Sequence, residues 1–187
     1  MPNLLGITGS LRAGSFNTAL LRAAQRGAGS GVGIEIATLH GIPLYDGDLE
    51  ASAGIPTAVA TLKARVLASD GVLIATPEYN NSMPGVLKNA VDWLSRPAAD
   101  IGRVFGGRPF AIIGASPGGF GTILAQNAWL ATMKALGVNL WSGGRVTVAR
   151  AATLLDASGE IADEATLKQL AAFVQGFAAY AAANRRG

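Results

Sequence analysis

Cysteine is absent from this chain of 187 residues, and histidine occurs once, at position 40. Without cysteine there are no disulfide bonds, no thiolate metal ligands and no cysteine nucleophile. A single histidine argues against zinc sites and against catalytic triads that use a histidine base. We therefore predict no metal site, and we interpret His40 as an exposed loop residue rather than a catalytic one.

Charged residues are scarce as well, at 14% of the sequence, and the chain has no long hydrophobic run. The most apolar stretch, residues 170–183, is shorter than the roughly 20 residues that cross a bilayer. The first residues lack the basic and apolar segments of a secretory signal. The net charge of +3 comes from scattered residues, so no nucleic-acid surface is indicated. These absences predict a cytoplasmic protein with neither membrane nor nucleic acid as a partner.

What the sequence does contain is apolar residues, 50% of the total, and glycine, with 25 residues. This length and hydrophobicity exclude global disorder and predict one domain over residues 1–187 with a substantial core. So much glycine predicts many tight turns. The glycine-rich residues 27–33 could suggest a domain boundary, but we interpret them as a link between a helix and a strand.

Five short runs have the composition of β-strands. Three of them, residues 4–8, 72–76 and 110–114, are almost continuously apolar, which is typical of parallel strands covered on both faces. The other two, residues 34–38 and 145–148, alternate polar with apolar residues. Because such alternation suits strands with one side less covered, we predict these two runs at the edges of the sheet.

Helical patterns lie between these runs and after the last one. Their predicted limits are about 15–26, 56–69, 84–95, 122–136 and 163–184. The regular alternation of strand and helix predicts an α/β fold. Edge positions for the second and fifth strands favour a flavodoxin-like, doubly wound, five-stranded parallel sheet of order 2-1-3-4-5 with helices on both faces.

In such a sheet, ligands bind beside the carboxyl ends of the strands, at the switch point between the first and third strands. The loop after the first strand, residues 9–17, leads straight into a helix whose free N–H groups favour a phosphate. Its side-chain donors are Ser10, Arg12, Ser15 and Asn17. The loop lacks the Gly-Lys-Ser/Thr of a P-loop and the glycine spacing of a dinucleotide fingerprint. An ordinary turn with a helix N-cap is the alternative interpretation.

The loop after the third strand carries two prolines, an aromatic residue and several amides, in Pro77-Glu78-Tyr79-Asn80-Asn81-Ser82-Met83-Pro84. Prolines stiffen the segment, and its aromatic and amide groups suit the recognition of a planar heterocycle. Taken alone, the segment is a loop of ordinary turn residues.

The two loops together are more specific than either alone. The motifs are Gly9-Ser10-Leu11-Arg12 with Ser15 and Asn17, then Pro77-Glu78-Tyr79-Asn80, Pro84-Gly85, Leu87-Lys88-Asn89-Ala90 and Asp92-Trp93. Over roughly residues 4–175 the chain resembles the NADPH-dependent FMN reductase family, which includes quinone, azo-dye and chromate reductases. This resemblance implies a bound FMN, with NAD(P)H as co-substrate.

By that resemblance, a first group of residues is expected to hold the FMN phosphate: Ser10, Arg12, Ser15, Phe16 and Asn17. A second group is expected to border the isoalloxazine: Pro77, Glu78, Tyr79 and Asn80. In the loop after the fourth strand, Ser116 and the glycines that follow it match the family.

Acidic residues near these loops invite two further interpretations. Glu78 and Asp92 could suggest an acid–base pair, but a flavin enzyme requires neither, because the cofactor performs the redox step. Asp46 and Asp48 could suggest a cation site, but we interpret them as a polar turn at the rim of the crevice. We predict no catalytic side chain.

The function implied by the resemblance is that of an enzyme, an FMN-dependent oxidoreductase. Hydride passes from NAD(P)H to the bound FMN, and electrons then pass to a quinone-like, azo, metal-oxyanion or free-flavin acceptor in a ping-pong mechanism. Two other functions stay open. One is a flavodoxin-type electron carrier without turnover of its own, and the other is a non-redox module that binds a phosphate ligand.

Two tryptophans bear on assembly. Trp93 lies off the stripe of helix 84–95 that faces the predicted sheet, and Trp129 lies with Met133 on an outer flank of helix 122–136. The inner flank of helix 122–136 is predicted to contain Leu124, Ala128, Ala131 and Ala135. Extra apolar surface predicts a homodimer or homotetramer packed through these two helices, with the flavin sites near the interface, as the resemblance also implies. The alternative is that both tryptophans cover the core of their own chain.

Overall fold

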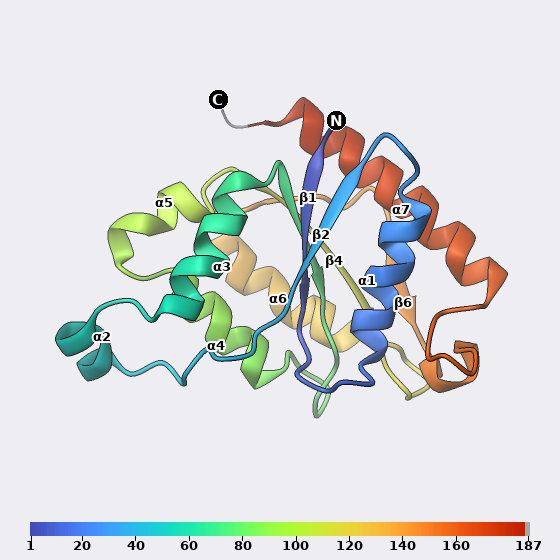
Figure 1. The fold of residues 1–187 in the computed structure, drawn as a ribbon, viewed down its shortest axis with the longest axis horizontal. Coiled ribbons are helices and arrows are strands. Elements are labelled where there is room, and N and C mark those ends of the chain that lie inside the picture. The colour runs from blue at the N-terminus through green and yellow to red at the C-terminus, as the bar shows by residue number, and fades with distance from the viewer. Residues whose placement is uncertain (186–187) are drawn as a thin grey trace.

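The computed structural model describes residues 1–185, and a parallel β-sheet runs through its centre (Figure 1). The strands are β1 (Asn3–Thr8), β2 (Gly33–Ala37), β3 (Gly71–Ala75), β4 (Pro109–Ala115), β5 (Asn139–Leu140) and β6 (Val146–Val148). The α-helices are α1 (Phe16–Gly27), α2 (Gly47–Ala53), α3 (Thr57–Ala68), α4 (Gly85–Leu94), α5 (Ile101–Val104), α6 (Ile123–Ala135) and α7 (Glu164–Ala183). None of the described helices is long and apolar enough to cross a membrane.

The strands follow the order β2-β1-β3-β4-β5 with parallel pairing, which confirms the predicted flavodoxin-like topology. Every residue of β3 and β4 is buried, as expected for strands covered on both faces. The position beside β4 differs from the prediction, because two short strands share it. β5 pairs with the start of β4 and β6 with its end, so that the sheet within residues 1–185 has six strands rather than five.

Helices cover both faces of the sheet, and each face has its own core (Figure 1). On one face, α1 and α7 pack against each other, with Leu21 and Phe177 among the buried side chains. On the other face, α3, α4 and α6 contribute Leu62, Val91 and Trp129. The sheet is therefore enclosed between two helical layers, which leaves its carboxyl edge and its loops open to ligands.

The five predicted helices agree with α1, α3, α4, α6 and α7 to within one residue at either end. Local signals at the helix starts account for this agreement. The side chains of Ser15 and Asp163 cap α1 and α7, and Pro56 and Pro84 directly precede α3 and α4. The sequence does not predict the short helix α2, because it has no buried residue and therefore no apolar periodicity.

The two tryptophans on which the predicted interface depends are fully buried in their own chain, so this premise is wrong. The indole N–H of Trp93 donates to the carbonyl oxygen of Pro43 at 2.9 Å. The indole N–H of Trp129 donates to Oγ1 of Thr76 at 3.1 Å. Each large ring therefore fills the core with its one polar atom satisfied.

On α6 the inner and outer flanks are exchanged relative to the prediction. Ala125, Trp129 and Met133 are buried against the sheet, whereas Leu124 is 41% exposed and Ala131 is exposed. Both flanks are apolar, so periodicity alone does not distinguish them. Side-chain size accounts for the outcome, because the core needs the volume of tryptophan and methionine to reach close packing.

Candidate cofactor site

Three loops meet at the carboxyl ends of β1, β3 and β4 and enclose a hollow between them. We call the loops after β1, β3 and β4 the first, second and third loops. Nine of the ten predicted cofactor residues line this hollow: Ser10, Arg12, Ser15, Phe16, Asn17, Pro77, Glu78, Tyr79 and Ser116. Asn80, the tenth, is not part of the lining. The parallel topology thus brings the motifs together at the switch point of the sheet.

The loop between β1 and α1 presents positive charge to the hollow. Ser15 Oγ accepts a hydrogen bond from the N–H of Thr18 at 3.2 Å, which leaves the serine hydroxyl able to donate to a ligand. The guanidinium of Arg12 donates to the carbonyl oxygen of Gly14 at 3.1 Å and lies 5.5 Å from the ring centre of Phe16. Arg12 has no acidic partner among the described residues, and the first turn of α1 has no acidic residue. The loop is therefore electrostatically suited to an anion.

Asn17 joins two of the loops to each other. Its amide Nδ2 donates to the carbonyl oxygen of Ala115 at 2.9 Å, and its Oδ1 accepts from the N–H of Ala115 at 2.9 Å. The side chain is buried. Asn17 therefore holds the start of α1 against the end of β4, and its expected contact with a phosphate stays a prediction.

Gly9 allows the first and second loops to approach closely. A Cβ atom at this position would lie 2.7 Å from Cδ of Pro77 and 2.8 Å from Cδ2 of Leu87. Its N–H donates to the carbonyl oxygen of Ala75 at 2.8 Å, which continues the pairing of β1 with β3. Glycine is therefore needed here for the approach of the two loops.

The loop after β3 turns back on itself as a two-residue hairpin. Tyr79 and Ser82 exchange backbone hydrogen bonds of 3.1 and 3.0 Å. Between them, Asn80 and Asn81 have positive φ angles of 50° and 60°, as in a type I′ turn. Asparagine tolerates this left-handed backbone better than most residues do. The turn therefore accounts for both asparagines without a ligand.

Glu78 ties this hairpin to the neighbouring helix. Its Oε2 accepts from the N–H groups of Leu124 and Ala125 at 2.9 and 3.0 Å. These N–H groups lie in the first turn of α6, where no intrahelical partner exists, and α6 has no side-chain bond from its own N-cap residue. A carboxylate is favourable there because of the helix dipole. The charge expected beside the flavin is thus already engaged by α6.

The loop after β4 is held by residues around it. The hydroxyl of Ser116 donates to the carbonyl oxygen of Gly121 at 2.6 Å, and its N–H donates to Val148 at 3.0 Å. From a left-handed backbone with φ of 48°, the N–H of Arg150 donates to Gly118 at 2.9 Å. Sequence reasoning missed Arg150, since it belongs to none of the recognised motifs and reaches this loop only because β6 pairs with β4.

The segment after β2 forms the rim of the crevice. His40 is exposed, as predicted, and its Nε2 lies 3.2 Å from the carbonyl oxygen of Leu11. Asp46 caps α2 through a 2.8 Å bond from the N–H of Asp48, which agrees with the interpretation of this pair as a polar turn. The described residues contain no group of three or more acidic or histidine side chains that could hold a metal ion.

Tyr45 is fixed at this rim by two bonds. Its N–H donates to Oδ1 of Asn89 at 2.8 Å, and its hydroxyl donates to Glu50 at 3.0 Å. A hydrogen bond from Arg96 lowers the pKa of the Glu50 carboxyl. The hydrogen bond to Glu50 raises the pKa of Tyr45. The tyrosine therefore stays protonated at neutral pH, and α4 holds the rim through its motif residue Asn89.

The model of the NADPH-dependent FMN reductase family matches residues 2–153. The chain belongs to this family. It is 45% identical over 161 residues to the NAD(P)H-dependent FMN reductase PA1204 of Pseudomonas aeruginosa, which covers 86% of this chain and 85% of that protein. It is 39% identical over 174 residues, 93% of each chain, to a 2-hydroxy-1,4-benzoquinone reductase from a Burkholderia species. Among solved structures, the flavoenzyme NAD(P)H:(acceptor) oxidoreductase FerB of Paracoccus denitrificans superimposes over 100% of both chains, with a TM-score of 0.87 and 34% identity.

Family membership makes this reductase a flavin-dependent oxidoreductase, with FMN as cofactor and NAD(P)H as co-substrate. The electron carrier and the non-redox module are thereby set aside. The donors of the first loop and the N-terminus of α1 fit the phosphate of FMN. The volume of the hollow, about 50 Å³, is far below the ~300–1,000 Å³ of pockets that surround a whole ligand, so the hollow is too small to enclose a complete FMN.

Proposed function

We propose that this reductase passes electrons from NAD(P)H to a quinone-like acceptor through FMN held between the three loops. The observation that carries the proposal is the convergence of nine motif residues, from loops far apart in the sequence, on one hollow at the N-terminus of α1. Relatives named as quinone reductases support the acceptor class. Azo, metal-oxyanion and free-flavin acceptors would use the same opening.

In this proposal the phosphate end of FMN lies at the first loop. Ser15 and Arg12 donate hydrogen bonds to it, and the dipole of α1 adds favourable potential. Pro77 and Tyr79, which line the hollow beside the hairpin, would border the ring system. Ser116 contributes as an acceptor, because its hydroxyl hydrogen is already donated to the carbonyl oxygen of Gly121.

A bound FMN would supply the redox chemistry, in which a hydride from NAD(P)H is accepted and two electrons are passed on to the acceptor. The task of the chain is to hold the donor within about 3–3.5 Å of the reacting position. Because the three loops enclose a single hollow, donor and acceptor use one opening in turn, which predicts ping-pong kinetics. We assign no catalytic side chain, since Glu78, the one carboxylate in the lining, is engaged by α6.

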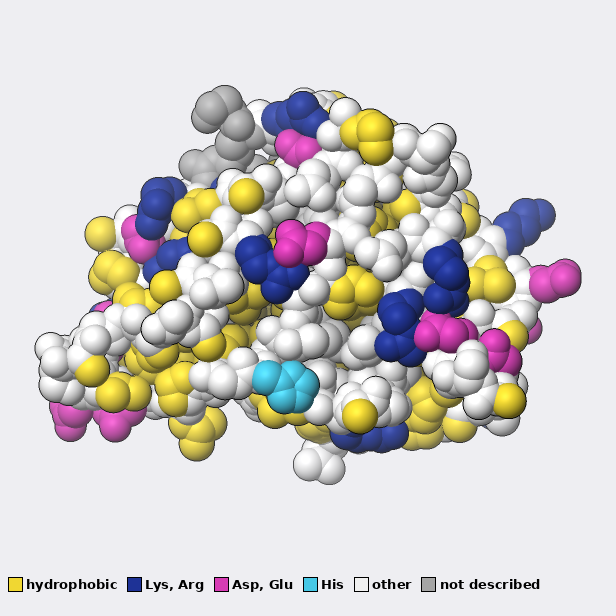
Figure 2. All heavy atoms as spheres, viewed as in Figure 1, with side chains coloured by type: hydrophobic (Ala, Val, Ile, Leu, Met, Phe, Trp, Pro, Cys, Tyr) yellow, Lys and Arg dark blue, Asp and Glu magenta, His cyan; other side chains and the backbone are white. Residues whose placement is uncertain are grey.

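An apolar rim around the crevice supports a planar, apolar acceptor. Large hydrophobic side chains are exposed on the loops after β1, β2, β3 and β4: Leu11, Leu44, Tyr45, Tyr79 and Phe120. Figure 2 shows hydrophobic side chains along the lower edge of the molecule, on both sides of His40, the single cyan side chain. Contact with this rim would remove apolar surface of a quinone from water.

Assembly as a homodimer or homotetramer is part of the proposal. Because Trp93 and Trp129 are buried, the proposal depends on other exposed apolar side chains. Phe120 and Leu124, 82% and 41% exposed, continue the rim onto the first turn of α6. A second copy packed there would cover these side chains and deepen a hollow that one chain only begins to enclose. Light scattering on Leu124→Glu is expected to show a smaller mass than the parent protein. Equal masses would count against this interface. A cytoplasmic location also stays a prediction.

The mechanism is tested by steady-state kinetics with NAD(P)H varied at several fixed concentrations of 1,4-benzoquinone. Parallel lines in double-reciprocal plots are expected, whereas intersecting lines would contradict the alternating use of one opening. FMN titration followed by flavin fluorescence tests the site independently of turnover. Tight binding of FMN without any turnover of 1,4-benzoquinone would contradict the proposed acceptor class, and no binding would refute the proposed site.

A further inference from the structure

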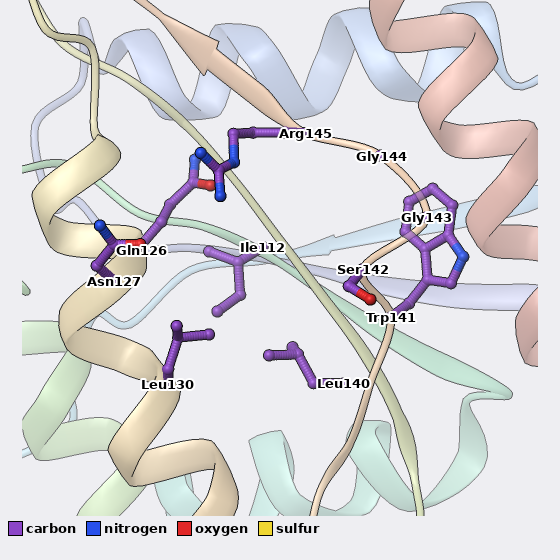
Figure 3. A pocket seen from close by; sticks show the side chains of 10 residues that line it. All are labelled: Ile112, Gln126, Asn127, Leu130, Leu140, Trp141, Ser142, Gly143, Gly144 and Arg145. Atoms are coloured by element: carbon purple, nitrogen blue, oxygen red, sulfur yellow. The ribbon is translucent and has the colours of Figure 1, made fainter.

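A second pocket lies where the chain leaves the sheet between β5 and β6. Phe110 of β4 pairs with Leu140 of β5, and Ile113 of β4 pairs with Val146 of β6. The segment from Leu140 to Val146 therefore has more residues than the segment of β4 beside it. The extra residues, 141–145, bulge out of the sheet between β5 and β6. Between this bulge, β4 and α6 is a pocket of about 360 Å³, which we call the strand-gap pocket (Figure 3).

The bulge that forms one wall of the strand-gap pocket has a defined shape. The ring of Trp141 packs edge-to-face on Phe173, with 4.7 Å between ring centres, and lies 5.9 Å from Phe177. The backbone N–H of Trp141 donates to the carbonyl oxygen of Phe110 at 2.8 Å. At Gly143 a Cβ atom would lie 2.6 Å from Nε1 of Trp141, so the turn requires glycine. The wall is therefore held in place before any ligand arrives.

One end of the strand-gap pocket is polar and carries an uncompensated positive charge. Within residues 1–185, the exposed guanidinium of Arg145 makes no ion pair or hydrogen bond. Gln126 donates through Nε2 to Val146 at 2.8 Å and to Thr122 at 3.1 Å, so its amide is fixed. Figure 3 shows Arg145 and Gln126 projecting toward the same end of the pocket, with Asn127 on the α6 side. No acidic residue is in the lining.

The other end of the strand-gap pocket is apolar. Leu130 and Leu140 face this end in Figure 3, with Ile112 of β4 between them and the polar end. Leu130 is 50% exposed, so a large apolar side chain is presented to the pocket and to water. The strand-gap pocket shares no lining residue with the cofactor hollow.

We propose that the strand-gap pocket binds an amphipathic monocarboxylate, with its carboxylate on Arg145 and its apolar body against Ile112, Leu130 and Leu140. A guanidinium matches a carboxylate through two parallel hydrogen bonds, and here it has no competing acid. The volume falls within the ~300–1,000 Å³ that is usual for small-molecule sites. The site is independent of the proposed electron transfer, since it stands on other residues.

The test is calorimetric titration of the FMN-loaded protein with 2-naphthoate, beside the uncharged 2-naphthalenemethanol. Saturable binding of the acid at one site per chain is expected, with the alcohol at least tenfold weaker. Arg145→Gln is expected to weaken the acid about ten- to a hundredfold, as for other charge-assisted contacts. Lys168→Gln removes the same charge from an exposed position of α7 outside the pocket and serves as the matched control, with no change expected.

Three results would overturn the strand-gap proposal. The first is no saturable binding, and the second is equal affinity for the parent protein and Arg145→Gln. The third is competition between 2-naphthoate and FMN or NAD(P)H, which would place the probe in the cofactor crevice. Leu130→Asn gives a second variant, at a position of α6 that is exposed and lies outside both cores. It is expected to weaken the acid while circular dichroism and mass stay unchanged, and a lower mass without acid binding would assign the pocket to a second copy of the chain instead.

Discussion

The first and second loops of the cofactor site use their side chains in opposite ways. In the loop after β1, Arg12 has no acidic partner and Ser15 retains a hydroxyl hydrogen to donate. In the loop after β3, Glu78 is engaged by the N-terminus of α6, and Asn80 and Asn81 form the left-handed turn. In the first loop, Arg12 and Ser15 therefore have groups free for a ligand. In the second loop, Glu78 holds the neighbouring helix, and Asn80 and Asn81 shape the turn.

A residue in a cofactor motif can therefore serve to hold a loop or a helix in place rather than to bind the cofactor. Both motifs indicate the same family, but one acts through charge and the other through backbone shape. Substitution of the exposed Arg12 in the first loop should change ligand affinity and leave stability intact. Substitutions in the second loop and its support should change stability or local order first and affinity only as a consequence.

The largest effect is expected below the second loop, at Trp129. Trp129→Ala should lower the free energy of unfolding by about 3–5 kcal/mol, because it leaves a cavity under the loop and removes the bond to Thr76. Trp129→Phe keeps most of the volume and should cost much less. Urea denaturation measures both variants. A loss below about 1 kcal/mol for Trp129→Ala would contradict its role in the core.

The next largest effect is expected in the first loop, at Arg12. Arg12→Ala should weaken FMN binding about ten- to a hundredfold, or about 1.5–3 kcal/mol, through loss of one charge-assisted phosphate contact. The free energy of unfolding should stay unchanged, because Arg12 is exposed. Arg12→Lys retains the charge and should recover part of the affinity. Fluorescence titration that finds equal affinity for Arg12→Ala would remove Arg12 from the site.

A smaller effect is expected at Glu78. Glu78→Gln keeps an acceptor but removes the negative charge from the N-terminus of α6, which should cost about 1 kcal/mol of stability. Hydrogen exchange at the amides of Leu124 and Ala125 should speed up, and FMN should bind severalfold more weakly. Glu164→Gln removes a first-turn carboxylate from α7 and serves as control, with no effect on FMN. Unchanged exchange in Glu78→Gln would contradict the anchoring role.

Substitution in the hairpin, at Asn81, should change stability by no more than Glu78→Gln does. Asn81→Ala should lower stability by about 1 kcal/mol, because alanine is strained at a φ of 60°, while Asn81→Gly should be close to neutral. Thermal unfolding compares the two variants. If alanine were as stable as asparagine, the turn would not explain the residue, and a ligand role would regain support.

The smallest effect is expected at His40, which lies at the rim and outside both loops. His40→Ala removes one exposed contact with the carbonyl of Leu11 and should leave turnover nearly intact. The pH profile of turnover should match that of the parent protein. If the pH dependence of turnover changed in His40→Ala, His40 would have a role in proton transfer, which the geometry does not support.

The alternation of strands and helices, the helix limits and the motif loops could all be predicted from the amino-acid sequence. These features depend on neighbouring residues, such as the cap at Ser15 or the continuous apolarity of β3. Parallel topology then requires loops at the carboxyl ends to share one edge, so the position of the cofactor hollow also follows from the order of the elements.

Which side chains in that hollow have hydrogen-bonding groups free for a ligand depends on the three-dimensional packing and could not be predicted. The bond of Glu78 to α6 and the bond of Asn17 to Ala115 join segments that carry no local sign of each other. The same holds for the split beside β4 and for α6, whose two apolar flanks give no sign of which one faces the sheet. Local pattern sets which groups are available, but long-range packing sets which of them are already paired, because a buried polar or bulky group is stable only where its distant partner fits.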